Sequence, residues 1–429
     1  MKKIKLTALE RSWILYDIGN SAFILLVSTL IPIYFNDLAT TGGLNESLYL
    51  SYWGYAGSVS TLLVAVIGPI CGTLADHRGF KKPIFMACML LGVLGCAAMG
   101  VTAGWLAFLV VFVLAKVGYS SSLVFYDAML PEVTTDERMN TVSSMGYAYG
   151  YIGSVIPFIL CLLLVQFGDK IGVGAGTAMV VSFLITAVWW FVCTQPLLKR
   201  YRQTAFVEHG GNPVSSTFRR LRDTFREVRQ QKHIFLYLLA FFFFIDGVYT
   251  IIDMATAYGT ALGLDTTGLL LALLLTQFVA FPCSIAFGRF SAKYDTGLLI
   301  KICILCYTGI TLFAVFLVSQ WQFWVLAVLV GMFQGGIQAL SRSYLGKIIP
   351  AERSGEYFGL MDICGKGASF LGTTLIAMVS QLTDGRSFHV FGLELQNENI
   401  AVGTLVVIFA IGFVLFCKAD KLNKQYIHI

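Results

Sequence analysis

The sequence is poor in charged residues. Asp, Glu, Lys and Arg make up 13% of its 429 residues, whereas about a quarter is usual for soluble domains. Apolar types make up 57%, and the mean hydropathy is +0.76. Because a soluble fold of this length needs more charge to cover its surface, the composition excludes a soluble enzyme, a disordered chain and a fibrous one. It favours a helical membrane protein with several spans.

Histidine is also scarce, and cysteine does not form a recognisable framework. None of the five His residues falls in the middle of an apolar run, which argues against a haem site or a histidine proton relay. The ten Cys residues all lie within apolar stretches, where free cysteine packs as a small apolar residue. No nucleophile–base pair, metal-ligand cluster or G-x-x-x-x-G-K-[ST] loop is present in the sequence. We therefore expect neither an enzyme nor a nucleotide-driven pump, and no cofactor or metal.

Hydropathy divides the chain into twelve apolar segments. A transmembrane helix needs about 20 mostly apolar residues, and each segment approaches that length. The first segment follows three Lys residues, as in a signal peptide, but it is too long and carries Asp17 and Asn20, so we expect a retained helix. The expected spans cover residues 12–36, 52–74, 83–102, 105–127, 141–166, 174–195, 233–258, 267–289, 298–318, 322–345, 357–381 and 400–417.

Lys and Arg are distributed asymmetrically about these segments. With the N-terminus in the cytoplasm, all but four of the 30 Lys and Arg residues fall on the cytoplasmic side, which is the bias that orients membrane proteins. The exceptions are Lys170 and Arg386 in outer loops, and Lys116 and Lys366 within spans. We predict that both termini are cytoplasmic. The net charge of +6 reflects this bias, and we expect no nucleic-acid partner.

A long polar segment separates the first six spans from the last six. Apolar residues recur at helical spacing from Phe218 to Val228, with Arg residues around them. This pattern is typical of an amphipathic helix lying on the anionic inner leaflet, acting as a passive tether or, alternatively, as a regulatory site. The predicted domains are an N-terminal six-helix bundle over 1–195, a cytoplasmic linker over 196–232 and a C-terminal six-helix bundle over 233–429.

The two halves resemble each other, as in an internal duplication. Gly72 closes the second span and Gly288 the eighth, while Asp17 in the first span has a counterpart in Asp246 in the seventh. The members of each pair lie about half the chain apart. A duplication of six spans is typical of transporters built from two repeated bundles, with the substrate site between them.

Ionisable side chains within spans mark functional sites, because charge in lipid is costly. Here they concentrate on spans 1, 4, 7, 10 and 11. Asp17 and Asp246 are candidates for proton coupling, and Asp253 shares a helix face with Asp246 because it lies seven residues further on. Lys116 has no acid one turn away on its own helix, so its partner must come from another span. The candidate substrate-binding residues within spans are Asn20, Lys116, Gln334, Gln338 and Arg342.

The loop after the second span has a recognisable pattern. The stretch Gly72–Lys82 resembles the signature G-x-L-A-D-R-x-G-R-K-K of the major facilitator superfamily, while its second-half copy, Gly288–Gly297, has Ala292 in place of the Asp. In that superfamily the Asp caps a neighbouring helix, where a carboxylate is favourable, and the loop latches the halves on the cytoplasmic side. The resemblance implies the major facilitator fold and a cytoplasmic gate formed by Gly72, Asp76, Arg78, Gly79 and Asp127.

A narrower resemblance comes from the first span. The stretch Trp13–Phe23 resembles the Y-D-W-A-N-S-A opening of the autophagy-related vacuolar amino-acid effluxers of fungi and their bacterial relatives. Phe125–Glu132, Asp246–Ile252 and Ser341–Tyr344 fit the same group. Since spans 1, 4, 7 and 10 line the cavity in the superfamily, the resemblance adds Tyr249 to the expected substrate contacts.

These patterns predict an all-α membrane protein that works as a secondary transporter by alternating access. We expect a small polar solute, with an amino acid first and export as the implied direction, coupled to protons through Asp17, Asp246 or Asp253. The alternatives are transport of sugars or cell-wall fragments, and a scaffold or sensor that has lost transport. We expect a monomer in the bacterial inner membrane, with the lipid bilayer, a small-molecule substrate and protons as its partners.

Overall fold

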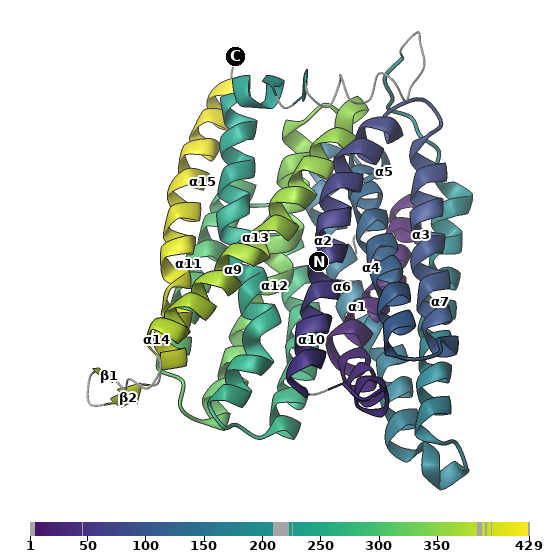
Figure 1. The fold of residues 1–429 in the computed structure, drawn as a ribbon. Helices are drawn as coiled ribbons and strands as arrows, with labels where there is room; N and C mark the ends of the chain where they lie inside the picture. The colour runs from purple at the N-terminus through teal and green to yellow at the C-terminus, as the bar shows by residue number, and fades with distance from the viewer. Residues whose placement is uncertain are drawn as a thin grey trace. The chain divides into compact units, whose positions relative to one another are not determined.

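The structure is a computed structural model that describes residues 5–44, 46–208, 223–224, 226–383, 388–390, 393–395 and 397–427. Within these residues the chain is almost wholly helical (Figure 1). The predicted linker helix lies mainly outside the described residues, although 223–224 and 226–230 are helical.

The first half of the chain is a series of long helices joined by short turns. Its elements are α1 (Ala8–Thr41), α2 (Glu46–Ala75), α3 (Lys81–Ala98), η1 (Met99–Val101), α4 (Trp105–Ala128), α5 (Leu130–Val133), α6 (Asp136–Phe167), η2 (Gly168–Ile171) and α7 (Ala175–Arg200).

The second half repeats this pattern after the linker. Its elements are α9 (Lys232–Ala261), α10 (Thr266–Phe290), α11 (Thr296–Val315), α12 (Gln320–Ile348), η3 (Ala351–Arg353), α13 (Ser354–Leu382), β1 (Phe388–Val390), β2 (Leu393–Leu395), α14 (Asn397–Gly403) and α15 (Leu405–Ile427). The two strands pair antiparallel and form a small hairpin, which the all-helical prediction did not include.

The observed helices overlap all twelve apolar segments and extend beyond most of them, although segment 298–318 runs past the end of α11. The reason is that hydropathy marks only the apolar part of a helix, while polar capping residues set its ends. Thr7 accepts a hydrogen bond from the backbone N–H of Glu10 at the start of α1, and Glu10 accepts one in return from the N–H of Thr7. Asp265 and Asp295 cap α10 and α11 in the same way.

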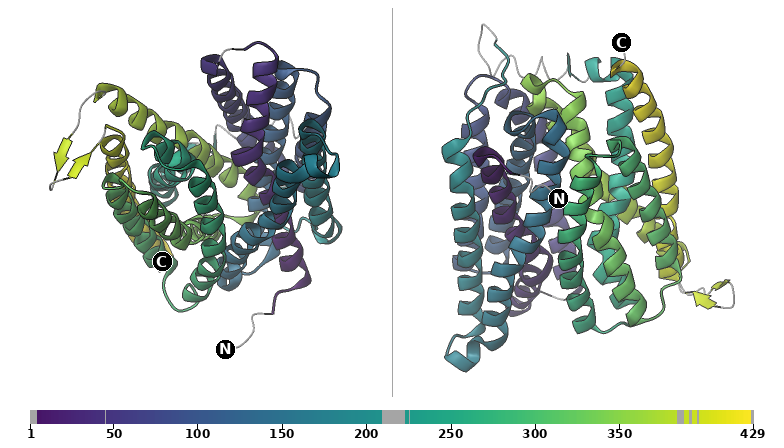
Figure 2. Two further views of the ribbon diagram at one scale, coloured as in Figure 1. Left: turned by 90° about the horizontal axis from the view of Figure 1, so that it is seen from below. Right: turned by 180° about the vertical axis from the view of Figure 1, so that it is seen from behind.

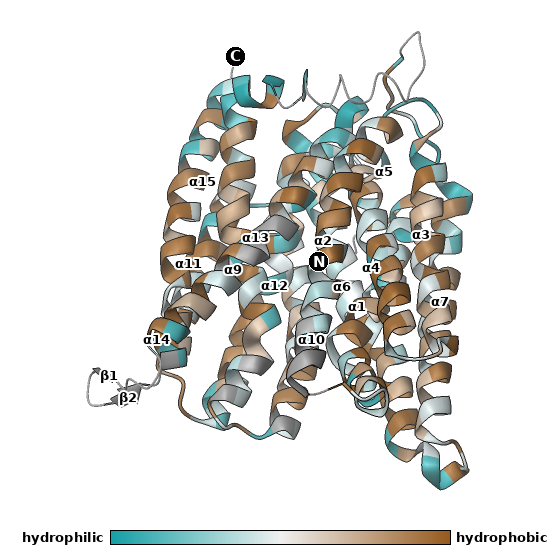
Figure 3. Ribbon diagram, in the orientation of Figure 1, coloured by the Kyte–Doolittle hydropathy of each residue, from teal (hydrophilic) through white to brown (hydrophobic). Residues whose placement is uncertain are grey.

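Eleven helices within the described residues are long and apolar enough to cross a membrane. The remaining long helix, α13, has 29 residues. The number of twelve spans therefore stays a prediction. Large apolar side chains such as Leu62, Val66 and Leu160 are exposed on the helices, and Figure 3 shows apolar residues over most of the helical surface. Such a surface suits a lipid environment.

The chain divides into two compact units, which are described separately. Unit 1 comprises Met1–Thr135, Tyr149–Phe218 and Ala351–Gly359, and unit 2 comprises Asp136–Ala148, Arg219–Pro350 and Leu360–Ile429. Unit 1 thus includes the first turns of α13, and unit 2 includes the first turns of α6.

Small residues bring the helices close together within each unit. In unit 1, Gly118 of α4 lies against Gly92 of α3, where an added Cβ would collide with backbone. In unit 2, α9 and α15 run side by side (Figure 2), and Gly412 of α15 lies against Phe244. These close contacts fix the helices that carry the intramembrane charges.

Candidate functional site

Asp17 of α1 lies in a buried aromatic site of unit 1. The hydroxyl of Tyr126 on α4 donates to Asp17 Oδ2 at 3.0 Å, and Asn20 Nδ2 lies 3.5 Å from Oδ1. The ring of Trp13 stacks on Tyr126 with centroids 4.2 Å apart. This set of contacts joins α1 to the end of α4 and supplies donors to the carboxylate.

Asn20 and Lys116 are the other predicted binding residues of unit 1, and their surroundings differ from each other. Asn20 is buried and also donates to the backbone carbonyl of Tyr16 at 3.0 Å. The half-buried Lys116 of α4 lies over the ring of Phe112, 5.9 Å from its centroid, with Gly57 of α2 beside its ammonium group. Its predicted ion pair with an Asp of another span stays a prediction.

Asp246 of α9 is completely buried in unit 2. Its Oδ1 accepts a hydrogen bond of 3.0 Å from the backbone N–H of Gly372 on α13. Among the described residues, no donor reaches Oδ2. Further along α9, Tyr249 is half-buried and Asp253 is exposed, so the two carboxylates that share this helix lie in very different surroundings.

The residues of the predicted polar stripe on α12 differ in their burial and contacts. Gln334 is buried and Gln338 is half-buried. Arg342 is also buried, and its guanidinium donates to the hydroxyl and the carbonyl oxygen of Ser143 at 2.9 and 3.0 Å. The same group lies 4.4 Å from the centre of the Tyr147 ring. In this structure Arg342 therefore holds the first turns of α6 against α12.

Two of the predicted gate residues, Gly72 and Asp76, meet the start of α13 where α2 ends, and we call this contact the unit 1 latch. The buried Asp76 carboxylate accepts hydrogen bonds from the backbone N–H groups of Gly355 and Glu356 at 2.8 and 2.9 Å. Gly72 lies directly against the carbonyl of Gly355, where no side chain fits. A carboxylate at a helix N-terminus satisfies free N–H groups and interacts favourably with the helix dipole.

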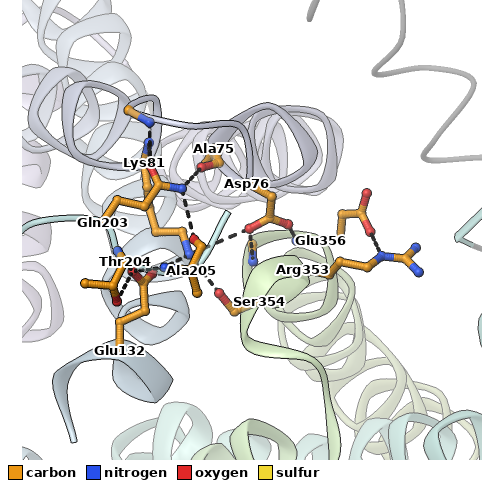
Figure 4. A network of polar contacts seen from close by, with 12 residues as sticks. Ala75, Asp76, Lys81, Glu132, Gln203, Thr204, Ala205, Arg353, Ser354 and Glu356 are labelled. Atoms are coloured by element: carbon orange, nitrogen blue, oxygen red, sulfur yellow. Dashed lines mark hydrogen bonds and ion pairs between the residues drawn. The ribbon is translucent and has the colours of Figure 1, made fainter. Parts of the chain in front are cut away.

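A buried ion network surrounds this latch (Figure 4). The Lys81 ammonium lies 3.7 Å from Asp76 Oδ1, 2.8 Å from Glu132 Oε1 of α5 and 2.8 Å from the hydroxyl of Ser354. The side chains of Lys81, Asp76 and Glu132 are at most 2% exposed. Buried charges of this kind are stable only when their partners remain in place.

The chain that follows α7 crosses this network as an extended segment, residues 201–207, which we call the strap. Glu132 Oε2 accepts from the backbone N–H groups of Thr204 and Ala205 at 2.6 and 3.1 Å, and Oε1 accepts from the Tyr201 hydroxyl. Gln203 accepts from the N–H of Gly79 at 2.9 Å and donates to the carbonyl of Ala75. The strap therefore ties the start of the linker to the latch.

The remaining gate residues lie at the edge of the network. Gly79 has a φ of +81°, a backbone conformation that favours glycine. Arg78 is exposed, and its guanidinium lies 5.2 Å from the centre of the Phe206 ring in the strap. Asp127 is half-buried. Burial raises the pKa of the Asp76 carboxyl to about 7, although Lys81 opposes the shift.

Sequence reasoning missed several residues that complete these sites. Tyr126 donates to the predicted Asp17 and Ser143 accepts from the predicted Arg342, while Glu132 accepts from Lys81 of the Gly72–Lys82 motif; in each pair the partner is distant in the chain. Glu132 gave a usable signal, because it follows Pro131 in a stretch already matched to the family. No feature of the sequence pointed to Gly372, because one glycine among 42 is not distinctive.

Solved structures define the class of this fold. The chain matches a major facilitator superfamily transporter, FucP, in the outward conformation, with a TM-score of 0.70, 14% identity and coverage of 96% of this chain and 97% of that one. It also matches the human organic anion transporter MFSD10, with a TM-score of 0.66, 15% identity and coverage of 95% and 98%. The protein therefore has the fold of the major facilitator superfamily.

Sequence comparison gives the family. The family described as "Vacuole effluxer Atg22 like" matches residues 8–420. The MFS-type transporter YxiO of Bacillus subtilis is 39% identical over 96% of this chain and 94% of its own length. Autophagy-related protein 22-1 of Penicillium rubens is 27% identical over 57% of this chain, and the match spans 45% of that protein. The chain is a multi-pass membrane transporter of the major facilitator superfamily and belongs to the Atg22-like family, which confirms the predicted resemblance.

Proposed function

We propose that this protein is a secondary active transporter of a small polar solute, with an amino acid as the first candidate. The observation that carries this proposal is the burial of Asp17 and Asp246, which the sequence predicts to be counterparts in two repeated halves. Buried carboxylates are costly in a membrane protein and are retained where they bind ions or substrate. A scaffold that had lost transport would have no need of them.

Proton coupling and export complete the proposal. A carboxylate that gains and loses a proton between two conformations couples solute movement to the proton gradient, and Asp17, Asp246 and Asp253 are the candidates. We assign contacts with the solute to Asn20, Lys116, Tyr249, Gln334, Gln338 and Arg342. The family description, vacuole effluxer, supports export.

The proposed topology has twelve spans and both termini in the cytoplasm, in a bacterial inner membrane. The distribution of Lys and Arg supports this orientation, because only four of these residues fall outside the cytoplasmic segments. In this orientation the unit 1 latch lies on the cytoplasmic side and serves as the gate there.

Counterflow in proteoliposomes tests the proposal. Vesicles loaded with one unlabelled solute should accumulate the labelled form of the same solute, and an amino-acid panel should contain the one exchanged. Exchange of a sugar or cell-wall fragment alone would show that the substrate class is wrong. No exchange of any solute, from protein that binds ligand in a thermal-shift screen, would favour the scaffold.

A further inference from the structure

Two buried oxygen atoms of α9 face the same point of α13. Asp246 and Thr250 lie one helical turn apart, and both side chains are completely buried in unit 2. Among the described residues, neither Asp246 Oδ2 nor Thr250 Oγ1 has a hydrogen-bond partner. Buried oxygen atoms without partners are unfavourable, and a bound cation would satisfy both of them.

Gly372 of α13 creates the space between these oxygen atoms and the neighbouring helix. A Cβ atom at this position would lie 3.0 Å from Asp246 Oδ2 and would collide with Thr250 Oγ1. The backbone N–H of Gly372 already donates to Asp246 Oδ1. Hence α13 orients the carboxylate through one oxygen atom, while the other oxygen atom and the Thr250 hydroxyl both lie beside Gly372 without a donor from the described residues.

The surroundings of this pair add no opposing charge. On its other side, α9 meets α15 at Gly247, where α15 presents the ring of Phe409. The second acid of α9, Asp253, lies about two turns away and is exposed. Within the described residues, therefore, the recorded partner of the carboxylate is the backbone N–H of Gly372, and a bound cation would supply the opposing charge.

Asp17 provides the contrast. Its carboxylate receives a hydrogen bond from Tyr126 and has the amide of Asn20 beside it. Fixed donors stabilise the charged form of a carboxylate without any added ion. Of the two equivalent carboxylates, only that of Asp246 has an oxygen atom for which the described residues supply no donor.

We propose that Asp246 and Thr250 form a binding site for one monovalent cation, a proton or Na⁺, that drives transport. A proton would neutralise Asp246 at Oδ2, and Na⁺ would be held between Oδ2 and Thr250 Oγ1, which make no direct hydrogen bond to each other. Carboxylate and hydroxyl oxygen atoms suit either ion, and mid-membrane sites of this kind bind Na⁺ or H⁺ in secondary transporters. The inference rests on the proposed function, because it names the coupling ion site of that transporter.

Occupancy of this site links the ion to the conformation of unit 2. With the cation bound, the carboxylate is neutralised and α13 remains packed against α9 through Gly372. Without it, a bare carboxylate remains in a buried position, which favours the entry of water and the separation of the two helices.

The test measures ion binding to the purified full-length protein, without any solute. The thermal stability of the protein is followed while NaCl replaces choline chloride at constant ionic strength and fixed pH, and proton uptake is followed with a pH dye in weak buffer. A rise in stability with Na⁺ identifies sodium. Proton uptake near neutral pH without a sodium effect identifies the proton.

Four variants make the assignment specific. We expect the ion effect to be lost in Asp246→Asn, to be weakened at least about tenfold in Thr250→Val and to return in Thr250→Ser. Thr311→Val is the matched control, because that buried hydroxyl already donates to the carbonyl of Tyr307, and it should bind the ion as the wild type does. Identical titrations of wild type and Asp246→Asn, or no ion effect in the wild type, would overturn the proposal.

The outcome is separable from that of the proposed function. If the ion binds and Asp246→Asn abolishes binding, but no solute shows counterflow, then the transport proposal fails while the site stands. If counterflow occurs and a proton or Na⁺ gradient drives Asp246→Asn as well as the wild type, then the site proposal alone fails.

Discussion

The same helix contact occurs once in each unit, with different chemistry. In unit 1 the end of α2 meets the start of α13 at Gly72 and Gly355. In unit 2 the end of α10 meets the start of α6 at Gly288 and Ser144, where an added Cβ on Gly288 would lie 2.9 Å from the Ser144 Cβ. Because the helices involved are counterparts in the repeat, we call the second contact the unit 2 latch.

The unit 1 latch is ionic and the unit 2 latch is largely neutral. Asp76 and Lys81 are buried in the first. In the second, Thr141 donates to the carbonyl of Gly288 at 3.1 Å, and Asn140 donates to the hydroxyl of Thr296 at 2.8 Å. Small residues are therefore enough for the helices to approach closely. Buried charge in addition makes the stability of the contact depend on pH and on the presence of every charged partner.

The largest expected difference between the latches is in their response to pH. Burial raises the pKa of Asp76 to about 7 from an ordinary value of 3.8, so the closed latch binds a proton more tightly than the open chain does. Protonation of Asp76 therefore stabilises the closed latch fully below about pH 4, and this stabilisation is lost as the pH rises through 7. The total is roughly 4 kcal/mol, from about 1.4 kcal/mol for each unit of pKa shift.

Hydrogen exchange measures this difference. The amide protons of Gly355 and Glu356 should become less protected as the pH rises from 5 to 8, after correction for the intrinsic exchange rate, while those around Ser144 should not change. An equal response in both units, or the opposite sign in unit 1, would contradict the assigned shift. Asp76→Asn should remove the dependence.

Removal of the Asp76 side chain should produce the next largest effect. Asp76→Ala leaves two buried N–H groups at the start of α13 without acceptors, at about 1–3 kcal/mol each. We expect the latch to lose about 3 kcal/mol, measured as lost protection of the α13 amides. The control is Asp295→Ala in unit 2, an exposed helix cap for which about 1 kcal/mol is expected. Equal losses of stability in Asp76→Ala and Asp295→Ala would show that the burial of Asp76 does not make its cap stronger than an exposed one.

Loss of Glu132 should release the strap from the latch. Glu132→Ala removes the acceptor for the N–H groups of Thr204 and Ala205 and one partner of Lys81. We expect a loss of about 2 kcal/mol, since hydrogen bonds to charged groups contribute about 1.5–3 kcal/mol. Limited trypsin cleavage at Arg202, which is exposed beside these contacts, should become faster. Glu208→Ala, at an exposed position just beyond the strap, should leave the cleavage rate unchanged.

The smallest effect should come from adding the missing acid to unit 2. Ala292 lies where the superfamily signature has Asp, and it is exposed. Ala292→Asp should change stability by less than about 0.5 kcal/mol, as surface substitutions do. Protection of the α6 amides should not increase. A clear increase in the protection of the α6 amides would contradict this, because it would show that an Asp at this position of the second-half motif is enough to stabilise the unit 2 latch.

The sequence located the helices better than it located their contacts. The apolar segments and the helices coincide because the hydrophobic requirement of a span is local to about 20 residues. The Gly72–Lys82 motif also drew attention to Asp76, which accepts hydrogen bonds at the start of α13, while its role in a gate stays a prediction. It did not identify Glu132 or the strap, because a hydrogen-bond acceptor in one loop does not specify which distant backbone N–H group it will meet.

Arg342 shows the same limit at a predicted binding residue. Its spacing from Gln334 and Gln338 indicated a polar stripe for a solute, and its role there stays a prediction. In the structure its guanidinium is bound to Ser143 and lies against Tyr147. Helical spacing fixes which residues share a face, but not what the facing helix presents.

The sequence by itself determined the class of protein, the position of its helices and the short list of charged residues in an apolar environment. These are properties of single segments and of their cost in lipid. Only the tertiary structure decided which of those charges have partners. Asp76 meets residues 279 and 280 positions away, and Asp246 meets Gly372 across 126 positions. Such pairings depend on how the helices pack. Packing brings backbone N–H groups to Asp76, a tyrosine hydroxyl to Asp17 and the backbone N–H of Gly372 to Asp246, and these donors decide what each carboxylate can do.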